Sequence, residues 1–185
     1  YMEPKFIEPP AFDLKGCFDD SAPIMPLIFI LSTGANPTDE LFSFAKDMGY
    51  DNKFTVISLG QGQGPRAEAA IEKAGKWGEW VMLQNCHLLP NWLKTLEKLL
   101  EQLEAKKPHE DFRLWLTTEP HPTFPNILLQ QSLKITFEAP PGLQQNLART
   151  YESLMHREYT EKGPPARAQL LFVLSWFHAV LQERR

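Results

Sequence analysis

Two stretches of this sequence have residue types that could contact a nucleotide or a metal ion. The first is the loop of residues 32–38, Ser-Thr-Gly-Ala-Asn-Pro-Thr, which follows an apolar run. A phosphate-binding loop at this place would read Gly-x-x-x-x-Gly-Lys-Ser/Thr. The loop has one glycine and no lysine before Lys46, and Pro37 lacks the backbone N–H that a phosphate needs. We therefore predict a degenerate Walker A position that binds no nucleotide, formed by Ser32, Gly34, Asn36 and Thr38.

The second stretch is the amide pair Gln84 and Asn85, which ends another apolar run. An ATP hydrolase needs an acidic residue here to hold Mg²⁺, often with a second residue to position water. Amides carry no negative charge and cannot act as a general base, so the pair predicts a degenerate Walker B position. Residues 114–133 contain no arginine or lysine that could serve as an arginine finger. Together these three differences predict that the domain alone is not an ATPase and has no catalytic residues.

A glycine-rich loop, Gly60-Gln61-Gly62-Gln63-Gly64-Pro65, superficially resembles a dinucleotide-binding fingerprint. In G-x-G-x-x-G the third glycine would fall on Pro65, and the loop follows the second apolar run instead of the first. We favour a turn whose glycines permit a positive φ. The alternative is a divergent nucleotide-binding hydrolase or dinucleotide binder that uses the loop from Gly60 to Gly64.

The cysteines and histidines do not form an obvious catalytic or metal site. Cys86 and His87 could act as nucleophile and base, but neighbours on a strand point to opposite faces. We therefore predict a structural role for Cys86. The five histidines show no metal-ligand spacing, so no metal site is expected.

Composition narrows the class of protein. The chain has 185 residues, a net charge of −4 and two cysteines. This fits one globular domain with a small appendage in a reducing, intracellular compartment. A nucleic-acid-binding domain would usually carry a basic surplus, so nucleic acid is not an expected partner. The longest apolar run, residues 170–180, is too short to span a membrane.

The elements that must position these stretches alternate between strand and helix. Continuous apolar runs predict the first four strands, and the alternation of Leu133, Ile135 and Phe137 predicts the fifth. The helical patterns start near an Asn, Gly or Pro: Pro37 and Pro90 are expected at the first helical position, and Gly78 can end the second helix.

Leu41, Ala45 and Met48 give the first helix one apolar face. Alternation of this kind predicts an α/β fold with a five-stranded parallel sheet and helices on both faces. The predicted strands are residues 26–31, 54–59, 80–83, 112–116 and 133–137.

The strands end before a helical tail. We expect an extended N-terminal segment at 1–22, the α/β core at 23–139 and a truncated helical lid at 140–185. One lid helix carries Leu143, Leu147, Tyr151 and Leu154, and the last helix, 166–185, is apolar on most sides. Large uncovered apolar surfaces mark interfaces, so Trp176 and Phe177 are predicted to face a partner.

Several stretches resemble the sixth AAA+ module of dynein heavy chains, of the axonemal type. They cover nearly the whole chain from about residue 23 onward and together are very specific. They are PLIFILS (26–32), SLGQGQGP (58–65), WVMLQNCHL (80–88), FRLWLTTEPHP (112–122), EAPPGL (138–143) and SWFHAVLQERR (175–185).

The resemblance implies an AAA+, P-loop NTPase-like core and a role in a minus-end-directed microtubule motor that drives ciliary and flagellar beating. Such a module lacks a working nucleotide site and closes the ring between the fifth and first AAA+ modules. The resemblance implies no cofactor in this module, with ATP and Mg²⁺ bound in other modules of a parent motor ATPase. It also implies binding of the parent to microtubules and to dynein intermediate and light chains, in the cytoplasm and the axoneme. A stand-alone protein-interaction module remains the other alternative.

Overall fold

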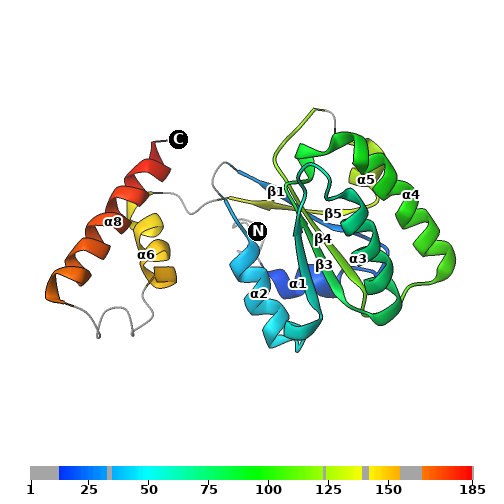
Figure 1. The fold of residues 1–185 in the computed structure, drawn as a ribbon, viewed down its shortest axis with the longest axis horizontal. Helices are drawn as coiled ribbons and strands as arrows, with labels where there is room; N and C mark the ends of the chain where they lie inside the picture. The colour runs from blue at the N-terminus through cyan, green and yellow to red at the C-terminus, as the bar shows by residue number, and fades with distance from the viewer. Residues whose placement is uncertain (1–12, 33–34, 123, 139–141, 155–163, 185) are drawn as a thin grey trace, which may run out of the picture. The chain divides into compact units, whose positions relative to one another are not determined.

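The computed structural model describes residues 13–32, 35–122, 124–138, 142–154 and 164–184. The chain forms two compact units (Figure 1). The first unit contains the sheet and the helices up to Phe137. The second contains the helices after Glu138, together with the short segment Ser32–Ala35.

A five-stranded parallel sheet organises the first unit, as the sequence predicts. The strand order is β2-β3-β4-β1-β5, so β1 lies between β4 and β5. The runs of the central strands β1, β3 and β4 are strongly apolar because these strands are buried on both faces. The strands are β1 (Leu27–Leu31), β2 (Phe54–Ser58), β3 (Trp80–Gln84), β4 (Arg113–Thr118) and β5 (Leu133–Phe137).

Helices connect the strands at the expected places. Pro90 is the first residue of α4, and Gly78, with φ 66°, ends α3. Helix α2 begins at Thr38, one residue later than predicted, with Pro37 as its cap residue. The connecting helices are α2 (Thr38–Asp47), α3 (Gly64–Trp77), α4 (Pro90–Lys106) and α5 (Asn126–Gln130), with the 3₁₀ turns η2 (Asp51–Lys53) and η3 (Cys86–Leu88).

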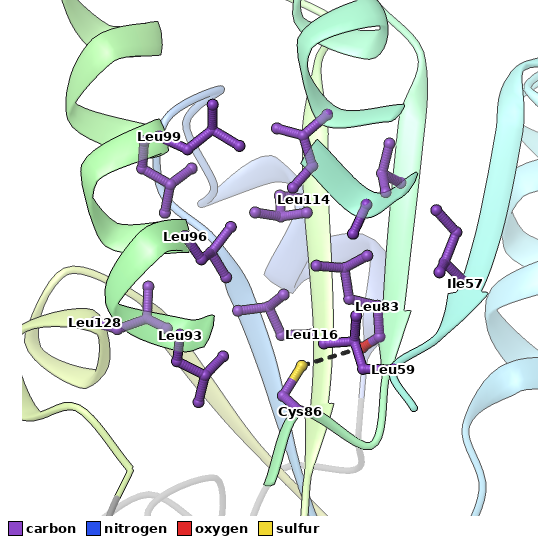
Figure 2. Close-up of a cluster of buried hydrophobic side chains, with 14 of the residues drawn as sticks. Ile57, Leu59, Leu83, Cys86, Leu93, Leu96, Leu99, Leu114, Leu116 and Leu128 are labelled. Carbon is purple, nitrogen blue, oxygen red and sulfur yellow. Dashed lines mark hydrogen bonds between the residues drawn. The ribbon is translucent and has the colours of Figure 1, made fainter. Parts of the chain in front are cut away.

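Helices α3, α4 and α5 lie on one side of the sheet and bury its aliphatic face (Figure 1). Leu93, Leu96 and Leu103 of α4 point inward and are buried. Figure 2 shows leucines of this helix against side chains of the central strands, with Leu128 of α5 beside them. This leucine-rich layer buries one face of β3, the strand that leads into the amide pair.

The opposite face of the sheet is aromatic and is covered by α1 (Leu14–Asp19) and α2. The Trp80 ring has Phe18, Phe44, Tyr50 and Trp115 as aromatic neighbours, with the Tyr50 ring stacked at 4.6 Å between centroids. The predicted extended segment at 1–22 is thus wrong for Leu14–Asp19, which is helical; residues 1–12 lie outside the described residues.

Not every residue of the predicted apolar face of α2 is buried. Leu41 and Ala45 are buried as predicted, but Met48 is 37% exposed. Met48 follows the last residue of the helix, where its amide closes onto the Phe44 carbonyl at 3.0 Å. The helical periodicity therefore stops one residue before it.

The second unit contains a helix pair, α6 (Leu143–Leu154) and α8 (Pro165–Glu183). Asn146 Nδ2 donates to Glu183 Oε2 at 3.3 Å, and the Tyr151 ring meets the Phe172 ring edge-on. Ser175 and Ala179 are buried, because small side chains allow two helices to approach closely. Among the described helices, none combines the length and apolar character needed to cross a membrane.

Candidate functional site

Polar side chains gather at the carboxyl edge of the sheet in the first unit. Ser58 and Gln84 are paired in register at the ends of β2 and β3, so both side chains leave the sheet on the same face. Thr117 lies at the end of β4, and the amino end of α2 brings Thr38 to the same edge. In α/β sheets ligands bind outside the carboxyl ends of the strands, which makes this edge the candidate site.

A chain of hydrogen bonds links the two predicted degenerate motifs. Gln84 Nε2 donates to Thr38 Oγ1 at 2.7 Å, although the residues are 46 positions apart. The Thr38 hydroxyl in turn donates to Asn36 Oδ1, which also accepts the Thr38 backbone N–H at 3.1 Å. Asn36 therefore caps the start of α2 with its side chain, from two residues before the helix instead of one. The Thr38 hydroxyl is held between two partners of this chain.

Asn85 makes the turn that follows β3. It has φ 58° and ψ 45°, a left-handed conformation that asparagine tolerates better than most residues. Its backbone N–H donates to Thr117 Oγ1 at 3.0 Å, and its Nδ2 donates to Ser58 Oγ at 3.4 Å. The ends of β2, β3 and β4 are thus connected through one amide residue.

We call Asn36, Thr38, Ser58, Gln84, Asn85 and Thr117 the carboxyl-edge cluster. Its donors and acceptors are all neutral, so it has no carboxylate to neutralise a magnesium ion. Gln84 places an N–H group toward Thr38, and an N–H donor repels a cation. Elsewhere in the described ranges, no group of three or more His, Cys, Asp or Glu residues is arranged to hold a metal ion.

The structure gives cluster contacts for two of the four predicted Walker A residues. Asn36 and Thr38 belong to the carboxyl-edge cluster. Ser32 follows β1 but is assigned to the second unit, and Gly34 lies outside the described residues. The cluster is therefore defined by the start of α2 and the strand ends.

The glycine-rich loop has a packing reason for its last glycine. A Cβ on Gly64 would lie 2.8 Å from Trp92 Cδ1, inside van der Waals contact. The Trp92 indole is fixed there, because its Nε1 donates to Glu68 Oε1 at 2.8 Å. Gly62 has φ 80°, as the turn interpretation expects. A Cβ on Gly60 would meet no heavy atom within 4 Å, so the space beside this glycine is open.

Cys86 is buried, as a structural cysteine should be. Its thiol donates to the Leu83 carbonyl at 3.4 Å, the dashed line in Figure 2. Burial raises the pKa of this thiol to about 12, well above its ordinary range. The neighbouring His87 accepts the Glu119 backbone N–H at its Nδ1, 3.1 Å away. The two residues lie in η3 and not on a continued strand, so the strand-alternation argument does not apply to them.

The predicted partner-facing residues lie on α8. Trp176 is 46% exposed and Phe177 is 53% exposed, and Leu170 and Leu174 on the same helix are more exposed still. On the same helix, Ser175 and Ala179 are buried, so α8 has a buried side and an exposed apolar side.

Sequence reasoning missed three residues that the structure makes important. Ser58 and Thr117 complete the carboxyl-edge cluster, and each is a hydroxyl residue at the end of an apolar run, which is a usable signal. Arg113 is the third: it begins β4 yet is only 9% exposed. A charged residue inside an apolar run is the signal that could have identified it.

Comparison with known proteins gives consistent matches. The family described as "Dynein heavy chain region D6 P-loop domain" matches residues 22–136. The Dynein-1-beta heavy chain of the flagellar inner arm I1 complex from Chlamydomonas reinhardtii is 47% identical over 182 residues, 98% of this chain and 4% of that protein. Cytoplasmic dynein 2 heavy chain 1 from the same organism is 48% identical over 183 residues, again 98% and 4%. Human dynein axonemal heavy chain 2 is 45% identical over 182 residues, with the same two shares.

Proposed function

We infer the function from the family, because this chain belongs to the dynein heavy chain family and matches its D6 P-loop domain. The chain spans 4% of the length of the curated relatives that it matches. We therefore propose that it acts as one module of a much longer microtubule motor. On this proposal the parent chain is a motor ATPase that binds and hydrolyses ATP with Mg²⁺ in other modules.

The proposed role of this module is mechanical and non-catalytic. It would close the motor ring between the fifth and first AAA+ modules and pass their rearrangements on as a comparatively rigid block. The observation that carries this proposal is the bond from Gln84 Nε2 to Thr38 Oγ1. In a nucleotide-binding module the equivalent acidic and hydroxyl groups share a magnesium ion. Here the two side chains are hydrogen-bonded to each other, so the end of β3 and the start of α2 are connected without a bound ligand.

The axonemal assignment is also a proposal. Its support is the flagellar and axonemal dyneins among the relatives at 45–47% identity, although cytoplasmic dynein 2 matches at 48%. We propose that the parent is a minus-end-directed microtubule motor that drives ciliary and flagellar beating. On this proposal it is located in the cytoplasm and the axoneme and assembles with intermediate and light chains. Nucleic acid and membrane are not among its proposed partners.

The alternative of a dinucleotide binder finds little support at the glycine-rich loop. The space that a ligand would need beside Gly64 is taken by the Trp92 ring. Gly62 is accounted for by the turn and Gly64 by this close approach. The alternative of a stand-alone interaction module would rest on the exposed side chains of α8, which a ring module also explains as an interface.

The proposal is tested by counting the nucleotides that the parent heavy chain binds. Replacement of the hydrogen-bonded pair by isosteres, Thr38→Val with Gln84→Leu, should leave the number of bound nucleotides per chain unchanged. The speed of microtubule gliding at a given ATP turnover should fall, since only the mechanical join is weakened. The loss of one bound nucleotide per chain would overturn the proposal and identify the carboxyl-edge cluster as a nucleotide site.

A further inference from the structure

Arg113 is a charged residue that is buried at the edge of the core. It is the first residue of β4, and only 9% of it is exposed. Burial lowers the pKa of its guanidinium, while the neighbouring Asp111 carboxylate and Tyr50 act in the opposite direction. A buried guanidinium is tolerated when its N–H groups find acceptors.

The guanidinium reaches across the chain to the segment before the core. Its Nε donates to Ser21 Oγ at 2.8 Å, and its Nη2 donates to the Ser21 carbonyl at 3.4 Å, 92 residues away in sequence. Nη1 donates to the Glu110 and Phe112 carbonyls at 2.7 and 2.8 Å. One side of the fork therefore holds the start of β4, and the other side holds the segment that follows α1.

Further contacts join Arg113 and Ser21 to Phe18 of α1. Ser21 Oγ, while it accepts from Arg113, donates to the Phe18 carbonyl at 2.6 Å. The guanidinium carbon also lies 4.8 Å from the centre of the Phe18 ring, in cation–π contact. The same Phe18 ring packs against Trp80 and Phe44. Arg113 thus hydrogen-bonds to Ser21, just after α1, and contacts the last turn of α1 through the Phe18 ring.

Helix α1 has six residues, Leu14–Asp19, which is too short to be stable in isolation. Positive charge near a helix carboxyl end is favourable, because it interacts with the free carbonyls there. Basic residues are absent from the last turn of α1 itself, so the charge comes from Arg113. The helix depends on the core for this contact.

We propose that Arg113 is a clasp that fastens the segment of residues 14–21 to the amino edge of the sheet. When the clasp is removed, this segment detaches from the sheet while the sheet and its other helices stay folded. The inference concerns this chain alone and does not rest on its proposed role in a motor. In a ring module, such a clasp would make a pull on the preceding segment act directly on β4.

Hydrogen exchange followed by NMR on the whole chain tests the clasp. The reporters are the amides of Cys17, Asp20 and Ser21, which donate to Asp13, Gly16 and Phe18 carbonyls. In Arg113→Met these amides should exchange about tenfold faster or more, because the Ser21 hydroxyl and carbonyl oxygens lose their charged donor and the segment opens more often. Amides of β3, in the interior of the sheet, should change far less. The matched control is Arg66→Met, which removes an exposed arginine of α3 and should change neither set.

Two further variants keep the test decisive if Arg113→Met unfolds the core. Ser21→Ala lies outside the sheet and removes the hydroxyl that joins Arg113 to Phe18, so it should accelerate the same three amides to a smaller degree. Arg113→Lys keeps the charge but loses the fork, and should fall between wild type and Arg113→Met. Equal acceleration of the α1 and β3 amides in Ser21→Ala or Arg113→Lys, or unchanged α1 amides in Ser21→Ala, would overturn the proposal.

Discussion

The bond between Gln84 and Thr38 can be measured by a double-mutant cycle on the stability of this chain. Thr38→Val and Gln84→Leu each remove one partner with little change of volume. The bond is 2.7 Å long and joins neutral groups that are partly buried, so it should contribute about 1 kcal/mol. Each single variant should therefore lower the free energy of unfolding by about 1 kcal/mol, equivalent to about 2–4 °C in Tm for a chain of this size.

The double variant distinguishes this bond from unrelated effects. If the two side chains act together, the double variant should be less destabilised than the sum of the singles by about 0.5–1.5 kcal/mol. Urea unfolding followed by tryptophan fluorescence gives the three values, with Ser43→Ala, which removes an exposed hydroxyl of α2, as a control. Additivity within about 0.3 kcal/mol would refute the reasoning, because independent sites add in that way.

A further variant tests which side chain donates in the same bond. Gln84→Glu replaces the donor by acceptor oxygens of nearly the same shape. The Thr38 hydroxyl has one proton, so it cannot donate to the new carboxylate and to Asn36 Oδ1 together. Gln84→Glu should therefore destabilise the chain at least as much as Gln84→Leu. A more stable Gln84→Glu variant in the presence of Mg²⁺ would contradict this and indicate a latent metal site.

Three further predictions concern the glycine loop, the buried thiol and α8. Gly64→Ala should cost about 1–3 kcal/mol of stability, since its Cβ would lie 2.8 Å from an indole carbon, whereas Gly60→Ala should be nearly neutral in the same urea titration. Burial raises the pKa of Cys86 from 9.0 to about 12, so between pH 9 and pH 12 the thiol ionises only in the unfolded chain. The free energy of unfolding should therefore fall by about 1.4 kcal/mol per pH unit in this range because of Cys86, and Cys86→Ala should remove this slope. The chain should self-associate at high concentration through α8, and Trp176→Gln with Phe177→Gln should make it monomeric by light scattering; a wild-type monomer would count against this.

The strands and most helices could be predicted because their signals are local. Apolar runs marked four of the strands and the alternation of apolar residues marked the fifth, and a parallel sheet follows from the alternation of strands with helices. Pro90 and Gly78 marked helix ends because proline and glycine restrict the backbone in known ways. The amide pair could be placed at the carboxyl edge of the sheet, because it ends the third strand and parallel strands all end at that edge.

The parts that sequence could not supply depend on distant contacts. Helix α1 has no periodicity of its own and is held by contacts of Phe18 and Ser21 with Arg113, which is 92 residues beyond Ser21 along the chain. The bond from Gln84 to Thr38 joins residues 46 positions apart, and no local pattern predicts which amide of the pair reaches the helix. The close approach of Trp92 to Gly64 likewise requires two helices to be placed first.

The carboxyl-edge cluster, on our proposal, bonds to itself and takes no nucleotide. Isothermal titration of ATP with Mg²⁺ into this chain tests this most directly, with the Thr38→Val and Gln84→Leu double variant titrated in parallel. We predict no heat of binding for either protein beyond dilution. Saturable binding of one ATP per chain by the wild type, lost in the double variant, would contradict the proposal.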